Sequence, residues 1–406
     1  MNLTAFIAHR ITFQSKRSFS KLSVRIAILG IMLSLSVMIL AVAVVKGFKT
    51  EIREKIRGFS GDIILIKYDL NSSYENSPFS LGADTLKKLQ SLPDIQYAYP
   101  YAIKPGIINT DNEIEGVVLK GVDKSFNWDF FKKILVEGKV IDFTDSLAAR
   151  KQILISQHIA NRLKLKVGDD FLMYFVQENL RKRPFKIVGI YNLGVEEVDK
   201  TYVIGDLSII KRLNNWKDSQ VGGYEIRVKD FDKLESANSH VSDNIGFRLR
   251  AFSITEWYQT IFQWLSLLDI NTQVILILMM AVAVINMISA LLIIILERTS
   301  MIGILKALGS SNWSIQKIFL SNAAYLIGFG LLLGNVLGIG LGLLQTYTHF
   351  FKLDQVSYYM SFVPVQLELA DIIFLNAGTL VVCLLVLIIP SMLVTRISPV
   401  KAITFK

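Results

Sequence analysis

The sequence predicts a membrane protein with four transmembrane helices and a large α+β domain outside the cytoplasm. Three observations lead to this prediction. The 406 residues are 52% hydrophobic and only 19% charged, whereas soluble domains are nearer one-quarter charged. The apolar excess lies in four runs without a charged residue. Between the first two runs, residues 46–273 contain polar and apolar residues in alternation, as a soluble domain does. A cytosolic enzyme, a disulfide scaffold and a disordered chain are thereby excluded.

Each uncharged run is long enough to cross a bilayer as a helix, which takes about 20 residues for ~30 Å of hydrocarbon. The runs contain 20, 23, 27 and 23 residues and cover 26–45, 274–296, 318–344 and 372–394. None contains Asp, Glu, Lys, Arg or His. Ion-coupled transporters and intramembrane hydrolases need ionisable groups at membrane depth, so the sequence argues against both classes.

The distribution of charge predicts the orientation of the spans. Residues 1–25 contain five basic residues and no acidic one, and the segments 297–317 and 395–406 are also basic. Because short basic segments stay in the cytoplasm, both termini and the loop between the second and third spans are predicted to be cytoplasmic. The net charge of +10 then comes from the basic residues of the predicted cytoplasmic segments, and no nucleic-acid partner is expected.

The predicted organisation alternates membrane and water-exposed segments. The segment from Thr255 to Asp269 has no Gly or Pro, so it predicts a stalk helix that continues into the second span. Cys383 is the single cysteine, so the external domain cannot contain a disulfide and is expected to be held by its own core, as one unit or two subdomains. The predicted segments are an interfacial N-terminal helix at 1–23, the first transmembrane helix at 24–46, the external α+β domain at 47–270, the second transmembrane helix at 271–297 with its stalk from about 255, a cytoplasmic loop at 298–317, the third transmembrane helix at 318–344, a short external loop at 345–371, the fourth transmembrane helix at 372–394 and a cytoplasmic tail at 395–406.

The sequence carries no motif for catalysis, metal binding or nucleotide binding. The four histidines are scattered, without a His-Glu-x-x-His or Cys/His cluster. A Gly-x-x-x-x-Gly-Lys-Ser/Thr loop for phosphate is also missing. The chain is therefore predicted to be no enzyme, with no catalytic residue, metal or cofactor of its own, and the energy for any work must come from a partner.

The loop at 298–317 is the predicted attachment point for that partner. Its residues Met301, Ile304, Leu305 and Leu308 have the spacing of one apolar helix face, and Gly309 suits the end of that helix. A short apolar face tied to two spans suits insertion into a groove on another protein. The alternative is that this face lies against lipid.

The third span contains a four-residue glycine repeat, which favours close helix packing. The repeat could serve either another span of the same chain or a dimer seam. Its members are Gly330, Gly334, Gly338 and Gly342.

Several motifs resemble those of FtsX-like ABC transporter permeases. Glu297-Arg-Thr and Ile302-Gly-Ile-Leu-Lys-Ala-Leu-Gly309 resemble that family's coupling loop, and the ending Arg396-Ile-Ser-Pro-Val-Lys-Ala-Ile403 resembles its C-terminus. The external segment resembles a MacB-like periplasmic core domain in Phe185-Lys-Ile-Val-Gly-Ile190. Near the N-terminus, Ile7-Ala-His-Arg10 looks most like the lipoprotein-releasing permeases of the LolC/LolE family.

This resemblance implies the partners and the location of the chain. It implies a dimer with a second permease subunit, homo- or heterodimeric, and a LolD-like ABC ATPase subunit that binds the ATP and Mg. It also implies lipoprotein substrates, a LolA-like periplasmic carrier, contact with membrane lipid, and a bacterial inner membrane with the large domain in the periplasm. The alternatives are a related permease for efflux or for signalling to cell-wall hydrolases, and a membrane-anchored enzyme with its active site in 46–273.

The resemblance also assigns site residues. The basic turn at 181–184 resembles in position a hairpin that engages the carrier, and its alternative is a solvated hairpin tip. The residues assigned to ATPase coupling are Glu297, Arg298, Met301, Ile304, Leu305, Lys306, Leu308 and Gly309, and those assigned to carrier docking are Arg181, Lys182, Arg183 and Pro184.

Overall fold

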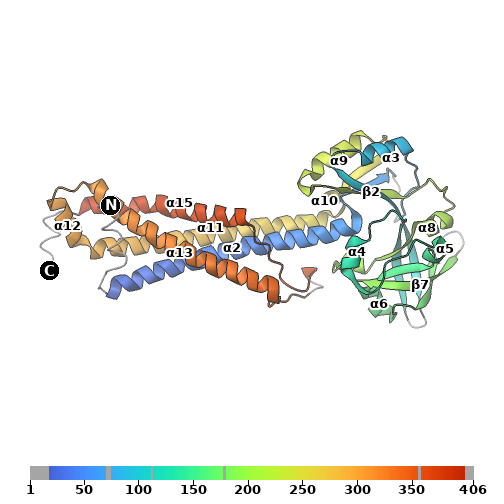
Figure 1. Cartoon of the computed structure of the whole chain (residues 1–406), viewed down its shortest axis with the longest axis horizontal. Coiled ribbons are helices and arrows are strands. Elements are labelled where there is room, and N and C mark those ends of the chain that lie inside the picture. Colours follow the sequence, from blue (N-terminus) through green and yellow to red (C-terminus); the bar gives the residue numbers. More distant parts are fainter. Residues whose placement is uncertain (1–17, 70–74, 111–112, 177–179, 355–357, 398–406) are drawn as a thin grey trace. The chain divides into compact units, whose positions relative to one another are not determined.

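The computed structural model describes residues 18–69, 75–110, 113–176, 180–354 and 358–397 (Figure 1). The chain divides into two compact units. The helical unit comprises residues up to 50, 264–352 and those from 362 onward, and the α/β unit comprises 51–263 and 353–361. Most of the predicted N-terminal helix at 1–23, and the end of the tail from residue 398, lie outside the described residues.

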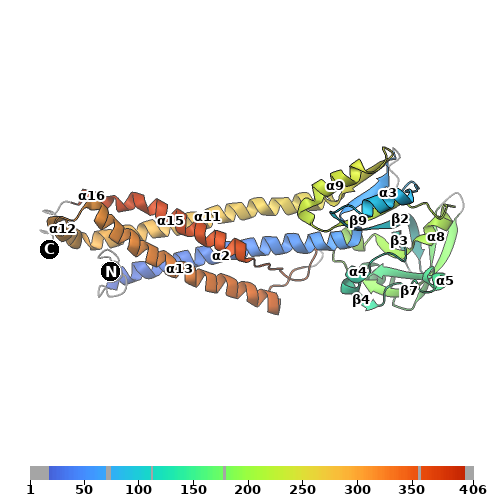
Figure 2. The same cartoon turned by 45° about the horizontal axis from the view of Figure 1, so that its top comes forward.

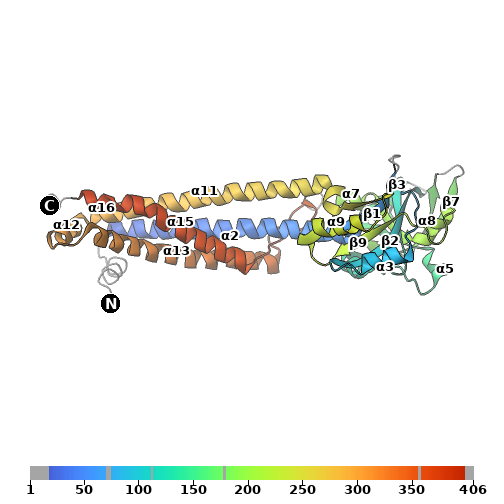
Figure 3. The ribbon, with the colours of Figure 1, turned by 90° about the horizontal axis from the view of Figure 1, so that it is seen from above.

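Four long helices dominate the helical unit and run side by side (Figures 1 and 3). Each is long and apolar enough to cross a membrane by length and composition, which confirms the four predicted spans. They are α2 (Ser18–Ser60), α11 (Gln259–Glu297), α13 (Asn312–Thr348) and α15 (Leu369–Ser391), joined by the short helix α12 (Thr299–Ala307) and followed by α16 (Leu393–Arg396). Both α2 and α11 contribute residues to the two units.

Three glycines of the repeat in α13, Gly330, Gly334 and Gly338, pack against α2 of the same chain, whereas Gly342 faces Leu367 and Val365. Figure 2 shows α13 crossing α2. A Cβ atom added to Gly330 would lie 2.7 Å from Cβ of Ile31, and one added to Gly334 would lie 3.0 Å from Cβ of Leu35. Ile31 and Leu35 are themselves fully buried. The glycines therefore provide the space that lets the two helix backbones approach closely.

Gly330→Ala is expected to destabilise the helical unit by about 1–3 kcal/mol, because the added methyl group would overpack the contact with Ile31. The matched control is Gly340→Ala on the same helix, where an added Cβ meets no atom within 4 Å. The Tm of each purified variant in detergent checks this. Equal Tm values for the two variants would show that α13 does not pack on α2 as described.

The α/β unit is built on one ten-stranded sheet with the order β10-β1-β9-β2-β3-β8-β5-β7-β4, and β6 pairs with β2 and β7. In its first part, the order β10-β1-β9-β2 interlocks two βαβ units. Helices α3 and α9 make the two connections. The elements of this part are β1 (Ile63–Lys67), α3 (Ala83–Gln90), β2 (Ile95–Asn109), β9 (Gly223–Val228), η1 (Phe231–Lys233), α9 (Leu234–Asp243) and β10 (Leu249–Ser253).

The rest of the sheet is inserted between β2 and β9, so the first part is interrupted in sequence but continuous in space. Both parts belong to the same compact unit. The inserted elements are β3 (Ile114–Val122), α4 (Asp129–Ile134), β4 (Leu135–Gly138), α5 (Ser146–Ala149), β5 (Gln152–Ser156), α6 (Gln157–Leu163), β6 (Asp170–Phe175), β7 (Arg181–Tyr191), α7 (Glu196–Asp199), β8 (Tyr202–Asp206) and α8 (Leu207–Leu213).

The predicted uninterrupted helix from Thr255 is wrong at its beginning. A separate turn of helix, α10 (Ile254–Trp257), is started by a capping box between Ser253 and Glu256. Tyr258 then leaves the helical conformation, with φ −107° and ψ 47°, and α11 begins at Gln259. The Tyr258 hydroxyl lies 2.8 Å from Oγ of Ser60, a long-range contact that the local sequence does not reveal.

Candidate functional site

The predicted apolar face of α12 is divided between the inside and the outside of the helical unit. Ile302, which the sequence analysis did not select, is fully buried, and Met301 and Leu305 pack partly against the same core. Ile304 and Leu308 are 53% and 78% exposed. Of the four predicted residues, Ile304 and Leu308 thus face outward, Met301 and Leu305 are partly covered by their own chain, and the opposite side of α12 packs inward through Ile302.

The end of α12 is held in a defined turn. Gly309 has φ +88°, its N–H donates to Lys306 O at 3.0 Å, and the Ser310 N–H donates to Leu305 O at 3.0 Å. These two bonds form a Schellman motif, as the predicted helix end at Gly309 requires. The Ser311 hydroxyl then accepts the Ser314 N–H at 3.3 Å and starts α13. The orientation of Leu308 is fixed by this turn.

Lys306 contacts the chain itself. Its Nζ donates to Ile397 O at 2.8 Å and to Thr395 O at 3.2 Å, both at the end of α16. A lysine that binds the last carbonyls of a helix also complements the negative end of the helix dipole. This contact ties α12 to the C-terminal end of α16.

Lys306→Met is expected to reduce ATPase activity stimulated by the chain about tenfold, because losing a charged hydrogen bond of ~1.5 kcal/mol would loosen α12. Membrane insertion should be unchanged. Lys306→Arg keeps a donor within reach and should restore most of the activity. Activity equal to wild type for Lys306→Met would show that the tie to α16 has no role in coupling.

Trp313 adds an exposed aromatic side chain to this region and was missed by the sequence analysis. It is 53% exposed, and the Lys317 ammonium lies 5.3 Å from its ring centroid. Glu297 and Arg298 lie before α12, at the end of α11 and at the N-cap, and both are half-buried. The residues best exposed for a partner are thus Ile304, Leu308 and Trp313.

The basic residues at 181–184 lie in strand β7, so their prediction as a turn is wrong. Arg181 pairs with Phe175 and Pro184 pairs with Leu172 across the β6–β7 hairpin. Sheet pairing with β6 makes Arg181 the first residue of β7, and residues 177–179 lie outside the described residues. The Arg181 guanidinium donates to Leu213 O at 2.9 Å, whereas Lys182 and Pro184 are exposed.

Apolar side chains stand exposed on the same hairpin. Val176 and Leu180, each 65% exposed, lie after the end of β6 and before the start of β7. Lys182, nearby in β7, is exposed as well. The hairpin therefore offers a surface of mixed apolar and basic character, a composition suited to binding another protein.

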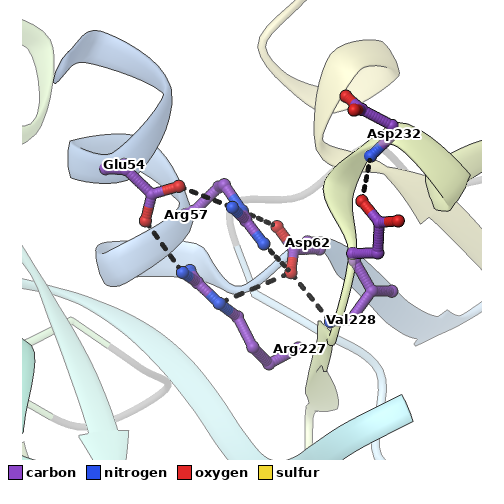
Figure 4. A network of polar contacts seen from close by, with 7 residues as sticks. Glu54, Arg57, Asp62, Arg227, Val228 and Asp232 are labelled. Atoms are coloured by element: carbon purple, nitrogen blue, oxygen red, sulfur yellow. Dashed lines mark hydrogen bonds and ion pairs between the residues drawn. The ribbon is translucent and has the colours of Figure 1, made fainter. Parts of the chain in front are cut away.

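Buried charges hold the end of α2 in the α/β unit, as Figure 4 shows. Asp62 is completely buried and accepts Arg57 Nη2 at 3.1 Å and the Val228 N–H at 2.8 Å. Arg227 lies 3.6 Å from Asp62 and 2.9 Å from Glu54. This four-residue charge cluster was missed, because Arg227 comes from a distant segment and the burial of Arg57 and Asp62 follows from the tertiary fold.

A second buried pair lies beside the first. Lys120 Nζ is 2.6 Å from Glu225 Oε1 and also donates to Phe59 O near the end of α2. Burial lowers the pKa of Lys120 and raises the pKa of Glu225, and their mutual attraction opposes both changes. These contacts fix α2 to the central strands of the sheet.

Asp199 lies at a polar cleft of about 380 Å³ that is also lined by His158 and Glu196. Its carboxylate accepts the N–H groups of Gly194 at 2.8 Å and Leu193 at 3.1 Å. Burial is the main cause that raises its pKa. Among the described residues, no three His, Cys, Asp or Glu side chains converge on a possible metal position.

The raised pKa of Asp199 predicts a pH dependence of stability. Below its ordinary pKa of 3.8 the carboxyl is neutral in both states, and between that value and the raised one only the unfolded state ionises. The stability that Asp199 contributes is therefore lost as pH rises through the raised pKa. Relative to Asp199→Asn, wild type should lose stability with a slope of at most about 1.4 kcal/mol per pH unit. Urea unfolding in detergent from pH 4 to 7 checks this, and a constant difference would contradict it.

Comparison with known proteins places both units in known families. Residues 26–243 match the MacB-like periplasmic core domain, and residues 273–399 match the FtsX-like permease C-terminal domain. The chain is 23% identical over 436 residues to the lipoprotein-releasing system transmembrane protein LolC of Neisseria meningitidis, with 100% of both chains covered. It is 21% identical over 423 residues to the corresponding protein LolE of Haemophilus influenzae, again with 100% of both chains covered.

A solved structure is also similar to the chain. The crystal structure of the periplasmic region of MacB from Actinobacillus actinomycetemcomitans matches with a TM-score of 0.35 and 16% identity, over 52% of this chain and 97% of that one. The two family matches agree with the structure, which contains four apolar helices and an α/β unit. The chain belongs to the family of ABC transporter permeases that combine a MacB-like periplasmic core domain with an FtsX-like permease C-terminal domain.

Proposed function

We propose that this chain is the permease subunit of an ABC transporter that extracts lipoproteins from the inner membrane and passes them to a periplasmic carrier. The observation that carries the proposal is its similarity over the full length to lipoprotein-releasing system proteins, LolC and LolE. The proposal includes both termini in the cytoplasm, the α/β unit in the periplasm, and a second permease subunit.

The chemistry of the helices supports a lipid-anchored substrate. An acyl chain needs an apolar surface, and the four uncharged runs provide one. Large apolar side chains of α2 and α11 are exposed in the single chain, among them Leu33 on α2 and Ile277 and Ile285 on α11, with exposed fractions of 54%, 69% and 61%. We propose that the lipid anchors enter along these faces, between the first and second spans.

Removing an anchor from the bilayer needs an external source of energy. Each buried methylene contributes about 0.8 kcal/mol to membrane binding, so extracting one acyl chain of about 15 methylenes costs ~12 kcal/mol. The chain carries no nucleotide-binding motif, and ABC permeases work with an ATPase subunit. We propose that Ile304, Leu308 and Trp313 receive this ATPase and that the β6–β7 hairpin receives the carrier.

Depletion of the chain followed by membrane fractionation tests the proposal. Lipoproteins should accumulate in the inner membrane, while outer-membrane β-barrel proteins, which are not lipidated, keep their distribution. An unchanged distribution of lipoproteins would refute lipoprotein release. An efflux or envelope-signalling permease would instead change drug sensitivity or cell-wall hydrolysis, with lipoproteins in their usual place.

A further inference from the structure

Three exposed aromatic side chains lie close together in sequence where α13 ends. Tyr347, Phe350 and Phe351 are 82%, 71% and 61% exposed. The rings of Phe350 and Phe351 contact each other edge to face, with centroids 5.1 Å apart. Lys352 follows directly and is exposed as well. Neither the coupling loop nor the hairpin accounts for this aromatic segment, residues 347–352.

The aromatic segment is held by a buried amide. His349 ends α13 in a left-handed conformation with φ +48°, and its N–H donates to Gln345 O at 2.9 Å. The Gln345 side chain is 4% exposed, donates to Phe351 O and Val363 O at 3.0 Å each, and accepts the Phe351 N–H at 2.9 Å. The backbone at Phe351 is thus fixed, although its ring faces outward.

The level of the segment along the helices follows from contacts within the helical unit. Gln345 reaches Val363 O, and the next residue, Pro364, lies against Gly47 of α2, where an added Cβ would be 2.6 Å from Pro364 O. Gly47 comes two residues after the uncharged run 26–45. The aromatic segment therefore lies level with the residues just beyond the apolar part of α2.

Charged residues mark the same level on three helices. Lys46 of α2 pairs with Asp371 of α15 at 3.0 Å and also with Glu368, and Lys49 pairs with Asp269 of α11 at 2.6 Å. Ion pairs of partly exposed groups belong where hydrocarbon gives way to headgroups and water. Aromatic rings are enriched at this boundary, where an apolar body and a polar end are both satisfied.

We propose that Tyr347, Phe350, Phe351 and Lys352 form an anchor that binds the headgroup layer of bilayer phospholipids at the C-terminal end of α13. The rings lie among the upper acyl carbons and glycerol groups, and the Lys352 ammonium binds lipid phosphate. The anchor fixes the depth of the connection between α13 and α15. The anchor requires that the helical unit spans the membrane. It does not depend on which substrate the permease moves.

Nitroxide depth measurements on the full chain test this anchor. Cys383 is fully buried, so a spin label reacts at an introduced cysteine, and unlabelled wild type verifies this. Phe350→Cys, in nanodiscs of phosphatidylethanolamine and phosphatidylglycerol, is compared with Leu385→Cys on α15 and Asp218→Cys in the α/β unit, both exposed positions. Accessibility to oxygen and to a water-soluble nickel complex is measured at each position.

The label at Phe350→Cys should have intermediate accessibility to both reagents: to nickel, below Asp218→Cys and above Leu385→Cys, and to oxygen, below Leu385→Cys and above Asp218→Cys. These values would place it at headgroup depth. Nickel accessibility equal to that at Asp218→Cys would place the segment in water and overturn the anchor. Protection from both reagents would show that protein, such as a second copy, covers the segment, and would also overturn it. If Phe350→Cys fails to fold, Phe351→Cys and Tyr347→Cys give the same comparison.

Discussion

Leu308→Asp is expected to lower the affinity of the chain for its ATPase partner at least tenfold, while membrane insertion and Tm stay at wild-type values. Leu308 is 78% exposed, so the substitution breaks no packing in the chain. A carboxylate in the groove of a partner would lose apolar burial of about 1.5–3 kcal/mol and add an uncompensated charge. Copurification of the ATPase and its stimulated activity measure the effect.

The matched control is Leu147→Asp, because Leu147 is 69% exposed and lies in the α/β unit. It should leave ATPase binding unchanged. Leu305→Asp is a weaker test, since Leu305 packs partly on the core and the variant would lose stability as well. If Leu308→Asp binds the ATPase and supports transport as well as the wild type does, α12 is not the coupling site.

Asp62→Asn is expected to lower the free energy of unfolding of the α/β unit by about 3–5 kcal/mol. It removes a fully buried carboxylate and leaves the buried Arg57 and the half-buried Arg227 with Glu54, which is 44% exposed, as a carboxylate partner. Asp62 is fully buried, and Arg57 is 7% exposed. The loss should appear as a lower Tm, followed by the fluorescence of the tryptophans in this unit, which include Trp128 and Trp216.

The control for Asp62→Asn is Asp129→Asn, which breaks an exposed pair. Lys132 and Asp129 lie 3.3 Å apart, with side chains 60% and 73% exposed. Such pairs contribute about 0–1 kcal/mol, so Tm should barely change. Equal Tm values for Asp62→Asn and Asp129→Asn would show that the charge cluster does not hold α2 to the sheet.

The spans and several local elements could be predicted from the sequence, because their signals are local. An uncharged run suffices to predict a span, and the predicted helix end at Gly309 has a left-handed backbone conformation, with φ +88°. The glycine spacing predicted close packing, but the partner helix, α2, became known only from the structure.

What could not be predicted depends on distant partners. Strand β10 was missed because its core-facing positions are small, Ala251 and Ser253, and its stability comes from pairing with β1. Arg181 joined β7 through pairing with Phe175. The burial of Lys120, which is 2% exposed, depends on Glu225, more than a hundred residues later. Ile302 was passed over because spacing alone does not say which face of α12 meets its own chain.

The most direct test of the account is lipoprotein release from proteoliposomes that contain the chain, its ATPase and a radiolabelled lipoprotein. With ATP and the periplasmic carrier added, lipoprotein should move to the soluble fraction, and Leu308→Asp should abolish this transfer while Leu147→Asp preserves it. If the assembled wild-type complex hydrolyses ATP and the lipoprotein stays in the membrane, lipoprotein release is not the function of this permease.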